Sequence, residues 1–77
     1  MRVLVIEDEP RMLHLLQQGL RERGCAVMTA RDGQSGLDVA SGCTFDAIVL
    51  DIGLPGIDGY EIIRELRRRR QQTPILH

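Results

Sequence analysis

The sequence from residue 47 to residue 59 reads AIVLDIGLPGIDG, and it decides the fold. Four apolar residues, 47–50, are bounded by turn-forming residues, which is typical of a short buried strand. Asp51 follows directly, so this strand delivers one carboxylate at its C-terminal end. The loop after it contains three glycines and a proline, which permit unusual backbone angles and leave amides and carbonyls exposed.

The start of the chain has the same design. Residues 3–6 read VLVI and are followed by Glu7, Asp8 and Glu9. Two parallel strands that both end in acids would gather Glu7, Asp8 and Asp51 at one edge of a sheet. Crowded like charges raise each other's pKa, and a hard divalent cation bound by carboxylate oxygens would relieve their repulsion.

The rest of the chain alternates between helical and extended patterns. We expect helices at about 10–23, 34–40 and 60–70, and further strands at 25–30 and from 74 onward. Pro10 suits the first position of a helix, and Asp32 suits an N-cap. Regular alternation of strand and helix predicts right-handed crossovers and a parallel sheet, and therefore an α/β fold.

Several positions carry smaller expectations. The first helix should bury an apolar face made of Met12, Leu15, Leu16 and Leu20. Gly19 interrupts that face at a cost of about 1 kcal/mol against alanine, and close approach to the sheet is the expected reason. Cys25 and Cys43 are expected to be reduced and buried. His14 is expected at the surface, and the run 67–70, RRRR, is expected to be a solvated helix end, with a docking patch as the alternative.

Composition limits the classes of function that the chain can have. The chain has 77 residues and a formal net charge of −1, which fits one domain and argues against a strongly basic nucleic-acid-binding domain. The chain has one phenylalanine, Phe45, one tyrosine, Tyr60, and no tryptophan, so stacking on nucleic-acid bases is not expected. No stretch reads as a signal peptide or a membrane span, so we expect a cytoplasmic location and no membrane partner.

The two motifs, VLVIEDEP from residue 3 and IVLDIGLPGIDGYE from residue 48, closely resemble the receiver domain of two-component response regulators. They look most like the OmpR-like class, in which a winged-helix DNA-binding domain follows the receiver. The resemblance covers residues 1–77. It implies a flavodoxin-like (CheY-like) parallel sheet with flanking helices and strand order 2-1-3-4-5, of which this chain would supply four strands and three helices.

The resemblance also implies a chemistry. A carboxylate can attack phosphorus and form an aspartyl phosphate. By resemblance, Asp51 is the phosphoacceptor, the donor is a sensor histidine kinase, and the domain is a switch and not a turnover enzyme. Asp8 and Asp51 would bind Mg²⁺ directly, Glu7 directly or through water, and the backbone carbonyl of Gly53 would be a further ligand. Contact with DNA is expected only through an output domain absent from this chain.

The chain departs from the family in two ways. A receiver carries a Ser or Thr at the end of the fourth strand and a lysine at the end of the fifth, whereas this chain ends within the expected fourth strand and has no lysine. Thr73 precedes that strand and does not match the Ser/Thr position. We therefore expect a partial receiver, with an open strand edge that favours self-association.

Two alternatives remain. The chain could be a receiver remnant that binds proteins or itself without being phosphorylated. It could also be an aspartyl-phosphate phosphatase of haloacid-dehalogenase type, but those enzymes require Asp-x-Asp on the first strand, whereas this chain has Asp51-Ile52-Gly53 on the third.

Overall fold

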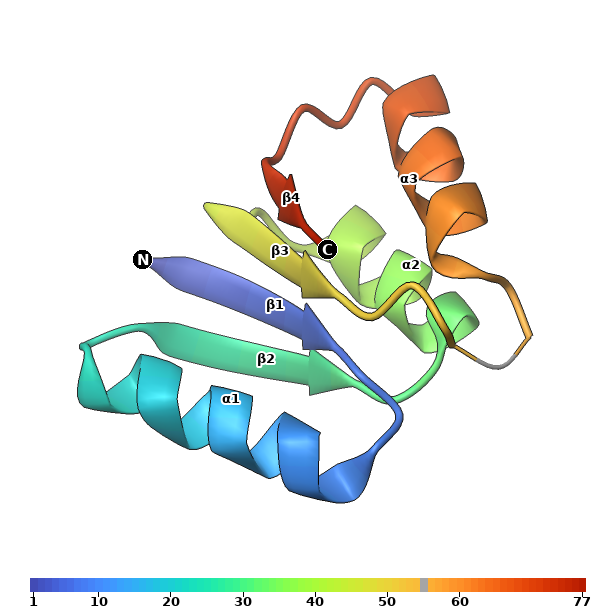
Figure 1. The fold of residues 1–77 in the computed structure, drawn as a ribbon. Helices are drawn as coiled ribbons and strands as arrows, with labels where there is room; N and C mark the ends of the chain where they lie inside the picture. Colours follow the sequence, from blue (N-terminus) through green and yellow to red (C-terminus); the bar gives the residue numbers. More distant parts are fainter. Residues whose placement is uncertain (55) are drawn as a thin grey trace.

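A four-stranded parallel sheet forms the centre of the computed structural model, which describes residues 1–54 and 56–77 (Figure 1). The strands are β1 (Arg2–Ile6), β2 (Ala26–Ala30), β3 (Ala47–Leu50) and β4 (Ile75–Leu76), in the order β2-β1-β3-β4. The predicted α/β fold, the parallel pairing and the strand order are confirmed. Pro55, the proline of the predicted loop, lies outside the described residues.

Three helices flank the sheet: α1 (Pro10–Glu22) on one face, and α2 (Gly33–Gly42) and α3 (Gly59–Arg68) on the other (Figure 1). Each begins at an acidic N-cap whose carboxylate accepts a hydrogen bond from an amide in the first turn. Glu9 accepts from Met12 at 2.7 Å, Asp32 from Ser35 at 2.8 Å, and Asp58 from Glu61 at 2.9 Å. Such caps satisfy amides that a helix leaves without partners, which is why the helices start where they do.

The core lies between the sheet and the layer formed by α2 and α3. Because side chains alternate along a strand, Leu4 and Ile6 of β1 point into this layer, where they are fully buried with Ile48, Ile62 and Leu66. Alternate residues Val3 and Val5 are buried as well. A strand that is buried on both faces explains the continuous apolar run at the start of the chain.

Close helix–sheet approach occurs at glycines of α2 and α3. A Cβ on Gly36 would lie 2.6 Å from Cδ1 of Ile6, and one on Gly59 would lie 2.6 Å from Cα of Ile52. The same reason was predicted for Gly19, and that prediction is wrong: among the described residues, nothing beyond the adjacent backbone of α1 lies within 4 Å of where its Cβ would be. Gly19 is on the exposed side of α1 and approaches nothing.

The packing of α1 also differs from the prediction. Leu16 and Leu20 are half-buried, but Met12 and Leu15 are 45% and 63% exposed. Leu13 is half-buried in their place, so the helix is turned relative to the predicted apolar face. The two cysteines, expected to be buried, are only half-buried and are free. No helix in the described part of the chain is long and apolar enough to cross a membrane.

Candidate functional site

The sheet fixes the backbone of two acids one residue beyond the ends of their strands. The amide of Glu7 donates to the carbonyl of Ala30 at 3.0 Å, which extends the pairing of β1 with β2. The amide of Asp51 donates to the carbonyl of Ile6 at 3.0 Å, which extends the pairing of β3 with β1. Both acids are therefore held by the rigid sheet and not by a loop.

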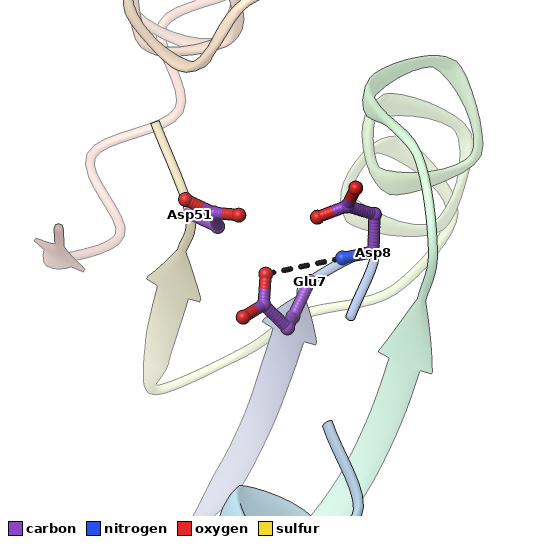
Figure 2. Close-up of side chains that lie close together, drawn as sticks. All are labelled: Glu7, Asp8 and Asp51. Carbon is purple, nitrogen blue, oxygen red and sulfur yellow. Dashed lines mark hydrogen bonds between the residues drawn. The ribbon is translucent and has the colours of Figure 1, made fainter. Parts of the chain in front are cut away.

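Three carboxylates converge at this edge. Glu7, Asp8 and Asp51 each offer an oxygen, and these oxygens all lie within 4.8 Å of one another. Figure 2 shows Asp51 and Asp8 facing each other across the gap, with Glu7 below and between them. The amide of Asp8 donates to Oε2 of Glu7 at 3.1 Å, which fixes the Glu7 carboxylate beside the turn (Figure 2). The predicted cluster is thus assembled by the fold.

Glu7 is the buried member of the cluster. Its side chain is only 8% exposed, and burial, followed by hydrogen bonding to Asp51 and the charge of Asp51, raises the pKa of its carboxyl from 4.5 to about 7. Burial removes water from the carboxylate, and the negative charge of Asp51 lies beside it, so the neutral form is favoured. Near neutral pH a large share of Glu7 is therefore protonated when no metal is bound.

Asp51 is affected in the opposite direction. The hydrogen bond from Glu7, followed by the one from the amide of Gly53 at 3.1 Å, lowers the pKa of its carboxyl below the usual value. Asp51 is half-buried, so it stays accessible from solvent. An ionised, accessible and rigidly held carboxylate meets the requirements of a nucleophile toward phosphorus.

The donor set suits a hard divalent cation. The three side chains offer only oxygen ligands, and Mg²⁺ is typically bound by one or two carboxylates together with water and phosphate oxygens. The pKa of Glu7 is raised first by burial and then by its neighbour Asp51, and a bound cation would offset both effects by favouring the ionised carboxylate. The residues present therefore fit Mg²⁺.

The neighbouring acids have structural parts. Asp58 is the N-cap of α3, and Glu9 is the N-cap of α1. Gly53 donates its amide to Asp51, and the ligand role of its carbonyl stays a prediction. Sequence reasoning did not anticipate how the loop closes: the amide of Gly59 donates to the carbonyl of Ile52 at 3.1 Å. The Asp-Gly pair at 58–59 was the available signal, since only glycine lets α3 start this close to β3.

A family model and known proteins match this chain over nearly its whole length. The model of the response regulator receiver domain family matches residues 3–77. Over 75 residues the chain is 49% identical to the transcriptional regulatory protein TcrA of Mycobacterium tuberculosis, covering 97% of this chain and 30% of TcrA. The chain thus spans about a third of the length of the curated relatives it matches.

Solved structures agree on the fold. The receiver domain of the Francisella response regulator 1452 superposes with a TM-score of 0.93 at 28% identity, over 96% of this chain and 61% of that one. The response regulator TrrA of Thermotoga maritima in complex with Mg(2+)-BeF gives 0.91 at 36% identity, over 96% and 64%. TrrA in complex with the histidine kinase ThkA gives 0.88 at the same identity and coverage. Taken with the matched family model, the acid cluster and the strand order, these likenesses show that the chain belongs to the response regulator receiver domain family of two-component systems.

Proposed function

We propose that Asp51 accepts a phosphoryl group from a sensor histidine kinase and that the domain works as a switch, not as a turnover enzyme. The observation that carries the proposal is the ionised, half-buried carboxylate of Asp51 at the end of β3, held beside Glu7 and Asp8. In the parent protein the switch would control an output domain that binds DNA, because matched relatives are named as transcriptional regulators. The cytoplasmic location stays a prediction.

Glu7, Asp8 and Asp51 would hold Mg²⁺, which supplies neutralisation of the charge that gathers as the phosphoryl group approaches. Support comes from the donor set and from the related TrrA, solved with Mg(2+)-BeF. Asp8 is the more exposed carboxylate of the first strand's pair, and Glu7 the buried one. Asp8 would therefore bind directly, whereas Glu7 must first lose its proton.

Phosphorylation is tested on the parent protein with a small phosphodonor and Mg²⁺, followed by intact mass. We expect one added phosphoryl group in the wild type and in Asp38→Asn, because Asp38 is an exposed acid of α2 outside the cluster. We expect none in Asp51→Asn. Equal labelling of Asp51→Asn would show that Asp51 is not the acceptor.

Mg²⁺ binding is tested separately, by NMR titration of Asp8→Asn and Glu9→Gln. Removing Asp8 deletes a carboxylate of the cluster, whereas Glu9 points away to cap α1 through its bond to Met12. We expect Asp8→Asn to weaken binding by at least tenfold and Glu9→Gln to leave it within twofold. A larger loss in Glu9→Gln would mean that the ligand assignment is off by one residue.

A surface for the kinase lies next to the acids on α1. A hollow of about 400 Å³ is lined by Pro10, Arg11, His14 and Leu15, and Leu15 is 63% exposed. The helix begins two residues after Asp8, so a protein docked here would stand beside the acceptor. We expect Leu15→Asp to slow transfer from the kinase and to leave labelling by a small phosphodonor unchanged. Equal loss in both assays would assign Leu15 to folding.

A further inference from the structure

Five of the ten basic residues, all arginine, lie between residues 64 and 70, in the second half of α3 and the turn after it. The side chains of two of them, Arg67 and Arg69, bind groups outside α3. Arg67 donates to the carbonyls of Gln71 and Thr73 at 2.7 and 3.0 Å, which holds the link to β4. Arg69 donates to Glu65 and to the hydroxyl of Ser41 at the end of α2. The run 67–70 was expected to be a solvated helix end, and all four residues are exposed, although two of them also make these contacts.

The other three, Arg64, Arg68 and Arg70, form what we call the arginine face. Within the described residues, the side chains of Arg64 and Arg70 make no hydrogen bond or ion pair, and both residues are exposed. Arg68 pairs with Glu65 at 2.7 Å, but its side chain is 74% exposed. Two N–H groups of Arg68 donate to the Glu65 carboxylate, at 3.0 and 2.7 Å, so an incoming anion would bind the remaining N–H groups of the guanidinium.

Arg70 occupies a backbone position that disfavours it. Its φ is +63°, the only positive φ of a non-glycine residue among those described, and it follows the end of α3 where glycine is the usual residue. A side chain in this conformation is strained relative to glycine. An arginine kept at a strained, exposed position without a partner points to a role that requires its charge.

The net charge of −1 conceals this face because acidic residues elsewhere in the chain offset its positive charge. The acid cluster lies beside the N-terminal end of α3, where the amide of Gly59 donates to the carbonyl of Ile52, whereas Arg68 and Arg70 of the arginine face lie at and beyond its C-terminal end. A ten-residue helix rises about 15 Å. At physiological salt the Debye length is about 8 Å, so the acid cluster does not cancel the potential at Arg68 and Arg70.

The surroundings of the face indicate the kind of partner. The exposed large hydrophobic residues are Met1, Met12, Leu15, Met28, Tyr60 and Leu76, and none lies between 61 and 74. Protein interfaces need buried apolar or aromatic anchors at their centre. Contact with a phosphodiester backbone needs only positive charge, and the guanidinium fork matches phosphate oxygens.

We propose that the arginine face, Arg64, Arg68 and Arg70, contacts the phosphate backbone of duplex nucleic acid without reading its sequence. The face adds a weak contact that the receiver itself makes, beyond the output domain through which DNA contact was expected. The contact needs neither phosphorylation nor Mg²⁺, so the proposal stands apart from the proposed function. Either one can fail without the other.

The test measures binding of this chain to a labelled duplex of about 20 base pairs by fluorescence anisotropy, without Mg²⁺. Three phosphate contacts predict that log K falls with log salt with a slope of about −2.7, which is roughly 40-fold between 50 and 200 mM salt. We expect the triple variant Arg64→Gln, Arg68→Gln, Arg70→Gln to bind at least tenfold more weakly at 50 mM salt and to lose most of the slope.

The matched control replaces three arginines of the other face of the sheet, Arg11, Arg21 and Arg23, by glutamine. This control has the same net charge as the test variant, and we expect it to keep the slope within one unit. If both variants lose binding equally, affinity follows net charge alone and the proposal fails. Tighter binding of phosphatidylserine vesicles or of an acidic peptide through the same residues would also overturn the nucleic-acid assignment.

Arg70→Gly separates binding from folding. Glycine relieves the positive φ, so we expect the midpoint of thermal unfolding to rise while the salt slope falls by about 0.9, the share of one phosphate. A variant that is more stable and yet binds less cannot owe its loss to unfolding. An unchanged slope in Arg70→Gly would remove Arg70 from the face and overturn the proposal.

Discussion

Replacing Glu7 by glutamine is expected to stabilise the metal-free protein at alkaline pH. Glu7 is buried beside Asp51, and its pKa rises from 4.5 to about 7. The folded state therefore holds the Glu7 proton more tightly than the unfolded state does. Between pH 4.5 and about pH 7 the folded state binds more protons, so stability falls as pH rises through this window. Below pH 4.5 both states are protonated and the penalty is absent.

The size of the effect follows from that pKa. A rise from 4.5 to about 7 corresponds to roughly 3 kcal/mol of unfolding free energy lost once Glu7 is ionised in both states. Glutamine keeps a donor for Asp51 and carries no charge, so the variant avoids the penalty. We expect Glu7→Gln to exceed the wild type by roughly 2 to 3 kcal/mol at pH 8, and by under about 1 kcal/mol at pH 5.

Urea denaturation followed by circular dichroism in EDTA, at pH 5 and pH 8, measures the difference. Glu22→Gln is the control, because Glu22 is an exposed acid of α1 far along the chain from the cluster, and we expect about 0.5 kcal/mol or less at either pH. Saturating Mg²⁺ at pH 8 should reduce the advantage of Glu7→Gln, since the wild-type site gains a cation. A variant whose stability matches the wild type at both pH values would refute the burial argument.

Other consequences can be measured on the same chain. Gly59→Ala should cost about 1 to 3 kcal/mol in urea denaturation, because its Cβ would lie 2.6 Å from Cα of Ile52. Gly19→Ala should gain up to about 1 kcal/mol, because nothing described beyond the adjacent backbone of α1 lies within 4 Å of its Cβ position, and equal effects of the two substitutions would contradict the packing. Addition of Mg²⁺ in place of EDTA should raise the midpoint of thermal unfolding more at pH 8 than at pH 5, because Glu7 is ionised only at the higher pH. An equal rise at both pH values would contradict the raised pKa of Glu7. Light scattering coupled to size exclusion should show dimers or larger species joined through β4, where Leu76 is 64% exposed. A monodisperse monomer that is unchanged by Leu76→Lys would count against self-association.

Local patterns in the sequence determined most of the fold and the identity of the site. The apolar runs before Glu7 and Asp51 predicted β1 and β3, and β3 spans the predicted residues 47–50. The Asp32 cap and the helix start at Pro10 depend on residues only a few positions apart, so they could be recognised without tertiary contacts. The two strands that end in acids predicted the cluster, because neighbouring parallel strands bring their C-terminal ends to one edge.

Only the tertiary structure decided which residues are buried and what that does to their charge. Glu7 and Asp8 are adjacent acids, yet Glu7 is buried and has a raised pKa, because segments distant in sequence cover it. The orientation of α1, which exposes Leu15, depends on where its face meets the sheet. The separation of the arginine face from the acids is equally a product of folding. These properties depend on contacts between residues tens of positions apart, and no short stretch of sequence encodes them.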